Sequence, residues 1–252
     1  MSWPRDLDLA IEAAFHAGEH LVRLLKEEKE VLSNEGRDIK LQADRDAEKL
    51  IVDHLRAHSD HALLAEEGGE YGRLDAREGP FWVIDPLDGT LNFSRSLPVC
   101  CVSIALMDRD GPQIGVIYDF NRDELFKALR GEGAWLNGRP IRTSGRTEAN
   151  QAVLATGLSA YGEHDEASMR RFIQVCNRFK KPRALGSAAI SLAWVACGRL
   201  DAYAENDIML WDVAAGWALV EAAGGYADVR VSPASRWARH VRIGATEALW
   251  RD

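Results

Sequence analysis

The stretch Phe81-Trp-Val-Ile-Asp85-Pro86-Leu-Asp88-Gly89-Thr-Leu-Asn-Phe93 decides how this chain is interpreted. A hydrophobic strand over 81–85 brings Asp85 to its end, and Pro86 is expected to stop the hydrogen-bonded ladder. Asp88 follows at a turn, where Gly89 permits a close approach of the backbone. Two carboxylates are thereby directed into one small volume. Like charges so close raise each other's pKa unless a cation lies between them, so the pattern predicts a bound metal or a shared proton.

The ligand type narrows the choice of metal. All-oxygen ligands favour Mg²⁺ or Mn²⁺ over zinc. If a helix begins at Gly89-Thr90, its free N–H groups and its dipole would hold an anion beside the cation. The competing interpretation is structural, because an isolated Asp-Pro-x-Asp-Gly run also forms an Asx turn between a strand and a helix.

Two further acidic segments favour the metal site. The run Leu64-Ala-Glu66-Glu67-Gly-Gly69 places paired acids directly after a strand, where alternation turns one of them toward the site. The run Leu210-Trp-Asp212-Val-Ala-Ala-Gly216 places an acid at the start of an apolar helix. Taken alone, Asp212 would be interpreted as a helix N-cap, a position that Asp favours.

The first half of the chain, residues 1–142, reads as α+β with a large, mostly antiparallel sheet. Apolar residues spaced three and four apart predict helices over about 4–29 and over 41–57. Asn137-Gly138 predicts a tight hairpin, because such turns need positive φ angles. Short runs rich in Val, Ile, Phe and Trp predict strands over 62–65, 81–85, 99–107, 113–120, 123–129 and 133–136.

The second half, residues 143–252, reads as layered α/β, because strand and helix patterns alternate along it. Gly224-Gly225 is expected to end the last long helix. No linker separates the halves, so they are expected to share an interface. The predicted strands cover 153–156, 183–185, 201–204 and 226–229, and the predicted helices cover 166–179, 187–197 and 213–223.

Composition excludes several classes of protein. The chain has 252 residues, 46% of them hydrophobic, and a formal net charge of −8, so it is a globular protein for which no nucleic-acid partner is expected. The longest apolar runs, 99–107 and 188–197, reach about half the length of a membrane-spanning helix. No membrane association and no secretory signal is expected, and we predict a cytoplasmic protein.

Cysteine and histidine patterns add little chemistry. The four cysteines include no Cys-x-x-Cys pair, so neither disulfides nor a zinc knuckle is expected. His54, His58 and His61 are spaced four and three apart, which on a helix could mimic a transition-metal site. We favour the simpler interpretation that they belong to an exposed polar face.

Taken together, these segments resemble the inositol monophosphatase family of metal-dependent, lithium-sensitive phosphatases. The resemblance runs from Asp38–Asp44 through Gly133–Gly138 to Trp211–Gly216 and Glu221–Gly225. Its signatures are Glu-Glu-Gly, then Asp-Pro-Leu-Asp-Gly-Thr, then Trp-Asp-x-x-x-Gly, and this order seldom arises by chance. It implies a layered αβαβα sandwich, a homodimer, and a substrate that is a small phosphorylated polyol or sugar.

The resemblance also implies which residues hold metal. Glu66, Asp85 and the carbonyl of Leu87 would hold one Mg²⁺, and Asp85, Asp88 and Asp212 would hold a second. Mn²⁺ is a possible substitute. Two such cations can clamp the attacking and leaving oxygens of an in-line displacement.

Catalytic and substrate roles follow from the same resemblance. Thr90, paired with Asp44, and Glu66 would position the attacking water and help to deprotonate it. Gly89 and Thr90 would contact the phosphate. The alcohol part of the substrate would meet Asp88, Gly186, Ser187, Ala188, Glu205 and Asp212.

One loop departs from the family pattern. Members often carry a Lys shortly before the position of Asp38, where this chain has Ser33-Asn-Glu-Gly36. Lys40 or Arg37 could substitute, so either two or three Mg²⁺ ions per subunit are expected. After Asp-Gly-Thr, the residues 91–93 are Leu-Asn-Phe, which favours inositol or sugar phosphates over adenosine bisphosphate.

The leading hypothesis is therefore a Mg²⁺-dependent phosphomonoesterase that hydrolyses inositol monophosphate or a related ester by attack of a metal-activated water. Fructose-1,6-bisphosphatase, histidinol-phosphatase and 3′(2′),5′-bisphosphate nucleotidase activities are alternatives. A hypothesis of another class is a non-catalytic, metal-responsive regulatory protein on the same scaffold.

Overall fold

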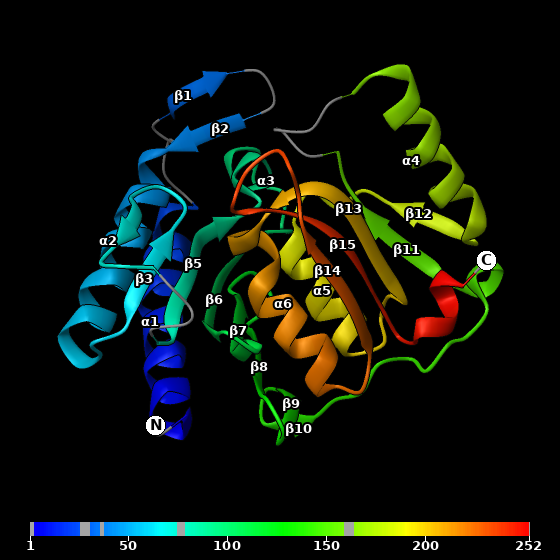
Figure 1. The fold of residues 1–252 in the computed structure, drawn as a ribbon. Helices are drawn as coiled ribbons and strands as arrows, with labels where there is room; N and C mark the ends of the chain where they lie inside the picture. The colour runs from blue at the N-terminus through cyan, green and yellow to red at the C-terminus, as the bar shows by residue number, and fades with distance from the viewer. Residues whose placement is uncertain (1–2, 26–30, 36–37, 75–78, 159–163, 252) are drawn as a thin grey trace.

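Helix and sheet layers alternate in the computed structural model, in the order helix, sheet, helix, sheet, helix (Figure 1). The structure describes residues 3–25, 31–35, 38–74, 79–158 and 164–251, and it leaves the side chains of 34–40 undescribed. The layered αβαβα sandwich expected from the resemblance is confirmed. It places the ends of several strands and helices at one edge, where the acidic segments meet.

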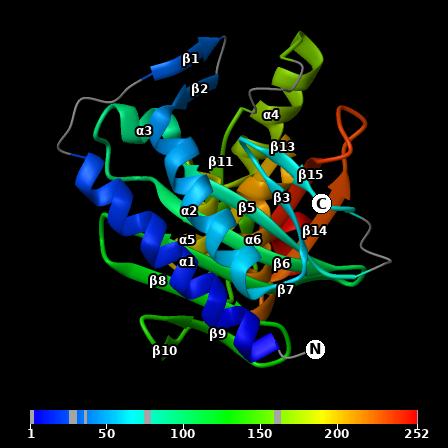
Figure 2. The same ribbon diagram turned by 90° about the vertical axis from the view of Figure 1, so that its left-hand side faces the viewer.

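The first layer consists of helices α1 (Trp3–Leu24) and α2 (Gln42–His58), which pack together over one face of the large sheet (Figure 2). Small buried residues such as Ala13, Ala14 and Ala17 allow a close approach of α1 to its neighbours. Both predicted helices are confirmed, and the last residues predicted for the first, 26–29, lie outside the described residues.

The large sheet is the second layer, with strand order β10-β9-β8-β7-β6-β5-β3-β4. Every neighbouring pair is antiparallel except β3 and β5. The predicted hairpin is confirmed, since φ is 48° at Asn137 and 76° at Gly138. The strands are β3 (Ala62–Ala65), β4 (Gly69–Tyr71), β5 (Phe81–Asp88), β6 (Cys101–Asp108), β7 (Gly111–Asp119), β8 (Glu124–Leu129), β9 (Gly133–Leu136) and β10 (Arg139–Pro140).

A two-stranded hairpin of β1 (Val31–Glu35) and β2 (Asp38–Leu41) was not predicted. Residues 33–35 of β1 were expected to form a loop, because a polar run of this kind carries no strand signal. The side chains of Arg37 and Lys40, named above as substitutes for a family lysine, lie outside what the structure describes.

A five-stranded sheet forms the fourth layer, with strand order β12-β11-β13-β15-β14. The strand predicted at 183–185 instead covers 181–183. Pro182 argued against a strand there, but β12 lies at the edge of the sheet, where a residue without an N–H is tolerated. The strand β15 was missed. The strands are β11 (Val153–Thr156), β12 (Lys181–Arg183), β13 (Ala202–Met209), β14 (Tyr226–Val231) and β15 (Ala238–Gly244).

Helices α5 (Ala188–Ala196) and α6 (Leu210–Ala222) form the middle layer, and α4 (Glu166–Arg178) covers the outer face of the second sheet (Figure 1). Both middle helices bury mainly apolar side chains, as a helix packed between two sheets must, although α6 also carries Asp212 and Glu221. Short helices α3 (Thr90–Ser94), η1 (Ala149–Gln151) and η2 (Glu247–Trp250) complete the chain.

The middle layer joins the two halves of the chain. Residues of α5 and α6 belong to one hydrophobic cluster with residues of both sheets. Because the two halves share this core, the predicted division of the chain between residues 142 and 143 stays a prediction. In the described part of the chain, no helix is both long and apolar enough to cross a membrane.

The contact between α5 and α6 should be sensitive to Gly216. An added Cβ there would lie 2.3 Å from Cβ of Leu192. Although Gly→Ala usually stabilises a helix by about 1 kcal/mol, we expect Gly216→Ala to lower the free energy of unfolding by about 1–3 kcal/mol, because the two helices must separate. Urea denaturation measures this change.

The matched control for Gly216→Ala is Gly79→Ala, where no described atom lies within 4 Å of the added Cβ. This control should leave the free energy of unfolding nearly unchanged. Equal stability of Gly216→Ala and the wild-type protein would show that α5 and α6 are not in close contact at this glycine.

Candidate active site

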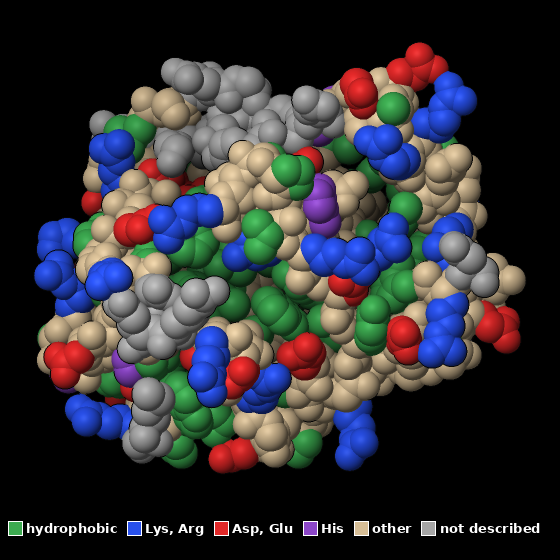
Figure 3. Space-filling view, viewed as in Figure 1, with side chains coloured by type: hydrophobic (Ala, Val, Ile, Leu, Met, Phe, Trp, Pro, Cys, Tyr) green, Lys and Arg blue, Asp and Glu red, His purple; other side chains and the backbone are tan. Residues whose placement is uncertain are grey.

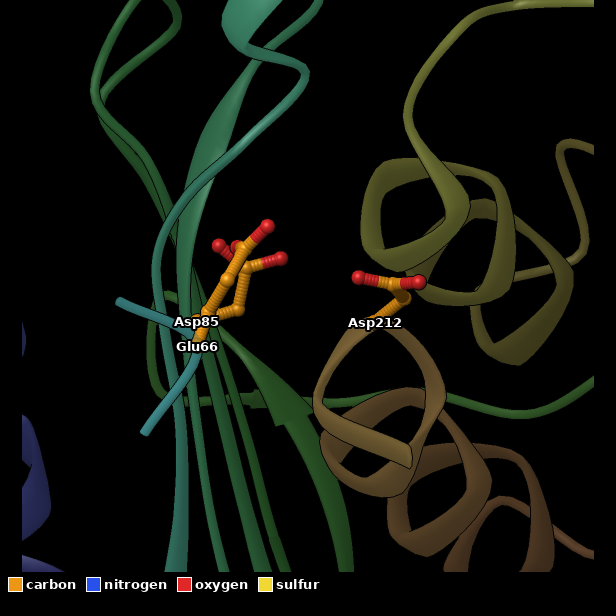
Figure 4. Close-up of side chains that lie close together, drawn as sticks. All are labelled: Glu66, Asp85 and Asp212. Carbon is orange, nitrogen blue, oxygen red and sulfur yellow. The ribbon is translucent and has the colours of Figure 1, made fainter. Parts of the chain in front are cut away.

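Three acids from distant parts of the sequence meet at one edge of the sandwich. Glu66 follows β3, Asp85 lies in β5, and Asp212 lies in the first turn of α6. One carboxylate oxygen of each lies within 4.8 Å of the other two. Figure 4 shows Glu66 and Asp85 side by side at the large sheet, with Asp212 facing them from α6. The segments singled out from the sequence are thus brought together.

A bulge in β5 directs the two aspartates of the central motif. Asp85 pairs with Ser103 and Asp88 pairs with Cys101, so the register shifts between them. The expectation that Pro86 ends the strand is wrong, because the strand continues to Asp88 through this irregularity, where a missing N–H is tolerated. The N–H of Leu87 donates to Oδ1 of Asp85 at 3.0 Å, which fixes that carboxylate.

Asp88 faces the N-terminus of α5. The N–H of Ala189 donates to its Oδ2 at 2.7 Å and the N–H of Ala188 to its Oδ1 at 3.3 Å, and the hydroxyl of Ser187 also donates to Oδ2. A helix N-terminus stabilises a carboxylate in this position. Two of the predicted substrate residues therefore bind Asp88, whose role as a metal ligand stays a prediction.

Thr90 and Asp44 form the pair expected from the resemblance. Oγ1 of Thr90 donates to Oδ1 of Asp44 at 2.8 Å, and the N–H of Leu41 donates to Oδ2 at 2.8 Å. Gly89 precedes Thr90 with φ of 94°, and an added Cβ would lie 2.7 Å from the carbonyl oxygen of Val99. The backbone can therefore turn from β5 into α3 only with glycine at this position.

Asn92 is a positioning residue that sequence analysis missed. Its Nδ2 donates at 2.8 Å to the carbonyl oxygens of both Val99 and Leu185. An added Cβ at Gly186 would lie 3.0 Å from the same nitrogen. Asn92 thus ties α3 to the loop that carries the predicted substrate residue Gly186. The signal available in the sequence was an amide side chain two residues after the Asp-Gly-Thr run.

Glu205 lies in β13 at a register shift with β15. The hydroxyl of Tyr203 donates to its Oε2 at 2.7 Å. An added Cβ at Gly157 would lie 2.4 Å from that oxygen, so β11 and Glu205 approach closely. The negative charge of Glu205 contributes to the raised pKa of Asp212, which connects this predicted substrate residue to the acid cluster.

Burial and mutual repulsion dominate the electrostatics of the cluster. Burial, followed by the charges of Glu66, Asp88 and Asp212, raises the pKa of Asp85 well above its usual range. Burial, followed by the charges of Glu66, Asp88 and Glu205, raises the pKa of Asp212 well above its usual range. Such shifts are typical of sites that bind a cation or a proton.

The donor set fits a hard divalent cation. Within the described structure, Oδ2 of Asp85 is buried without a hydrogen-bond partner. A buried, unpaired carboxylate oxygen costs free energy unless a cation or proton satisfies it. Asp85 and the two acids grouped with it, Glu66 and Asp212, offer only oxygen ligands, which Mg²⁺ prefers.

The histidines and cysteines weighed as metal ligands in the sequence do not form such a group. Over the described residues, Glu66, Asp85 and Asp212 are the group of His, Cys, Asp and Glu side chains that could hold a metal ion. Nε2 of His54 instead lies 3.3 Å from Oε2 of Glu12. Nε2 of His61 lies 3.6 Å from Oδ1 of Asp6. The four cysteines are free thiols.

Comparison with known proteins identifies relatives over nearly the whole chain. Residues 4–235 match the model of the inositol monophosphatase family. The chain is 43% identical over 225 residues to an inositol-1-monophosphatase of Synechocystis, covering 87% of this chain and 77% of that protein. It is 43% identical over 224 residues to the Nus factor SuhB of Xylella fastidiosa, and the match covers 87% of this chain and 80% of that protein.

Solved structures give the same result. An inositol monophosphatase from Anabaena superposes with a TM-score of 0.82 at 35% identity, covering 99% of this chain and 94% of that chain. The extragenic suppressor protein SuhB from Bartonella henselae superposes with a TM-score of 0.84 at 34% identity, covering 97% and 95%.

The buried acids should make the stability of the metal-free protein depend on pH. Burial raises the pKa of Glu205 from 4.5 to about 7. The folded state therefore holds a proton that the unfolded state releases between these pKa values, and this stabilisation is lost as pH rises through about 7. A difference of one in pKa between the two states corresponds to about 1.4 kcal/mol.

Glu205→Gln removes this titration, while its amide oxygen can still accept from Tyr203. In EDTA, we therefore expect the free energy of unfolding of Glu205→Gln to improve relative to the wild-type protein as pH rises from about 5 to about 7. Urea denaturation at several pH values measures the difference. A difference that is independent of pH would contradict the raised pKa of Glu205.

Proposed function

The chain belongs to the inositol monophosphatase family of phosphoric monoester hydrolases, and from that premise we propose that it hydrolyses inositol monophosphate or a related small polyol or sugar phosphate. The observation that carries the proposal is the convergence of Glu66, Asp85 and Asp212 within 4.8 Å around a buried carboxylate oxygen. These acids come from three elements that the layered fold brings to one edge.

The proposed metal ligands are the acids of this cluster and their neighbours. Glu66, Asp85 and the carbonyl of Leu87 would hold one Mg²⁺, and Asp85, Asp88 and Asp212 would hold a second. When bound, the ions would lower the pKa of water and neutralise charge on the phosphoryl oxygens. Mn²⁺ also fits these ligands, and a third, weaker ion is part of the proposal only if the loop before Asp38 supplies a partner.

Thr90 and Asp44 are suited to holding a water molecule and receiving its proton. Because Oγ1 of Thr90 donates its hydrogen to Asp44, its lone pairs are available to accept a hydrogen bond from water. Burial raises the pKa of Asp44 to about 7, so this carboxylate can take a proton near neutral pH. Glu66 is the second proposed proton acceptor.

The remaining proposed contacts bind the two parts of the ester, the phosphate and the alcohol. The backbone N–H groups of Gly89 and Thr90 would bind phosphate, because the chain turns there under a glycine constraint. Glu205 would accept a hydroxyl hydrogen of the polyol, and such buried acceptors discriminate strongly against analogues that lack the hydroxyl. The alcohol part would also meet Asp88, Gly186, Ser187, Ala188 and Asp212.

A second candidate function is a non-catalytic, metal-responsive regulatory role. Relatives named Nus factor SuhB, one of them 43% identical, favour it. The presence of every acid that the hydrolysis needs favours catalysis. A homodimer and a cytoplasmic location stay predictions.

Asp85→Asn should abolish Mg²⁺-dependent phosphate release and tight Mg²⁺ binding, because Asp85 is shared by both proposed metal sites. Phosphate release is measured on inositol 1-phosphate, fructose-1,6-bisphosphate, histidinol phosphate and 3′-phosphoadenosine 5′-phosphate, with and without Mg²⁺ and Li⁺. The preferred ester identifies the substrate class. Wild-type protein that releases phosphate from none of them, while still binding a macromolecular partner, would support the regulatory function.

Thr90→Ala should lower the turnover number by about 100-fold or more while leaving Mg²⁺ binding largely intact, since Thr90 is proposed to position the water and to lie outside the set of metal ligands. Thr90→Ser keeps the hydroxyl that donates to Asp44 and should retain most of the activity. Calorimetry and phosphate release separate the two effects. A Thr90→Ala enzyme with the normal rate would refute the assigned role.

A further inference from the structure

Helix α2 carries two buried acids one turn apart, on the side that faces the site. Asp44 is 2% exposed and Glu48 is 4% exposed. Because burying a carboxylate costs free energy unless its oxygens are paired, each must be held by specific partners. The partner of Asp44 is Thr90, described above. Nothing in the proposed chemistry yet uses Glu48.

Glu48 binds the turn that directly follows Glu66. The N–H of Glu67 donates to Oε2 of Glu48 at 2.8 Å. The hydroxyl of Tyr71, on the neighbouring strand β4, lies 3.4 Å from Oε1. The carboxylate of Glu48 thus contacts both the short connection between β3 and β4 and the strand that follows it.

The backbone of Glu66 itself is also anchored. The N–H of Glu66 donates to the carbonyl oxygen of Ile84 at 3.2 Å, which extends the pairing of β3 with β5. The space beside the turn is small, since an added Cβ at Gly68 would lie 1.9 Å from the Tyr71 hydroxyl oxygen and 2.7 Å from Glu48. Glu66 is therefore fixed between β5 on one side and Glu48 on the other.

Such an anchor is needed because Glu66 faces two other acids. One carboxylate oxygen of each acid lies within 4.8 Å of the other two, so the three negative charges repel one another. An unanchored turn would relax that repulsion by moving Glu66 away. Metal ligands work only when neighbouring groups hold them close to the binding geometry.

We propose that Glu48 is a positioning residue for metal binding, which holds the backbone after Glu66 so that the Glu66 carboxylate stays directed at Asp85 and Asp212. This role rests on the proposed function. It also gives α2 a double task, because the same helix holds Thr90 through Asp44 and the Glu66 turn through Glu48. The two acids lie one helical turn apart and so move together.

The test measures Mg²⁺ binding directly in Glu48→Ala and Glu48→Gln by titration calorimetry, and phosphate release at varied Mg²⁺ concentrations. We expect the dissociation constant for Mg²⁺ to rise about 10-fold or more in Glu48→Ala. Glu48→Gln should lie between this variant and the wild type, because its amide oxygen can still accept from Glu67. The substrate KM at saturating Mg²⁺ should change little.

Asp201→Asn is the matched control for loss of a buried acid. Oδ2 of Asp201 accepts from the N–H of Val153 at 2.7 Å, and Ser144 donates to Oδ1 at 2.6 Å, in the second half of the chain. This variant should lose stability in urea denaturation but keep the wild-type dissociation constant for Mg²⁺. A purely structural role of Glu48 predicts the same behaviour for both positions.

The outcomes are distinct. Wild-type Mg²⁺ affinity in Glu48→Ala and Glu48→Gln overturns the positioning role alone and leaves the proposed function standing. If Glu48→Ala does not fold, Glu48→Gln decides the question, since its shape and one acceptor are kept. Wild-type protein that neither binds Mg²⁺ nor releases phosphate overturns the proposed function, and the positioning role with it.

Discussion

The structure depends on holding several buried and half-buried carboxylates together against their mutual repulsion. Glu66 and Asp85 come from the large sheet, and Asp212 comes from a helix on the other side of the site. The free energy that opposes the repulsion comes from the middle layer, because α5 and α6 bury apolar side chains against both sheets and cannot move apart without exposing them. The site lies where this layer ends.

The direction of helices α5 and α6 also reduces the repulsion among the acids. Helices α5 and α6 both begin beside the acids, so their N-terminal N–H groups and dipoles offset some of the negative charge. The N-terminus of α5 satisfies Asp88 through Ala189, and Oδ2 of Asp212 accepts from the N–H of Met209 at 3.1 Å. The same N-termini leave Oδ2 of Asp85 without a hydrogen-bond partner in the described structure, which is why a cation fits best there.

Sequence patterns predicted most helices and strands and singled out the three acids that meet, because short motifs and hydrophobic periods are local, whereas the layered arrangement was implied by the family resemblance. Apart from the local hairpin of β1 and β2, the missed parts depend on distant residues. Asp88 binds Ala189 and Asn92 binds Leu185, and no local pattern connects either pair. Strand β15 alternates Val241 and Ile243 with basic residues, and it is recognisable as a strand only once β13 and β14 lie on either side of it.

Charge also limits the order of events in the proposed hydrolysis. A phosphate monoester is an anion, and it would approach a site whose acids already raise one another's pKa values. Without cations, the ester can be accommodated only if the acids take up protons, which removes the ligands that the chemistry needs. Metal must therefore bind before the ester or together with it. The anchors on α2 matter for this reason, because Asp44 and Glu48 fix Thr90 and the Glu66 turn before either charged partner arrives.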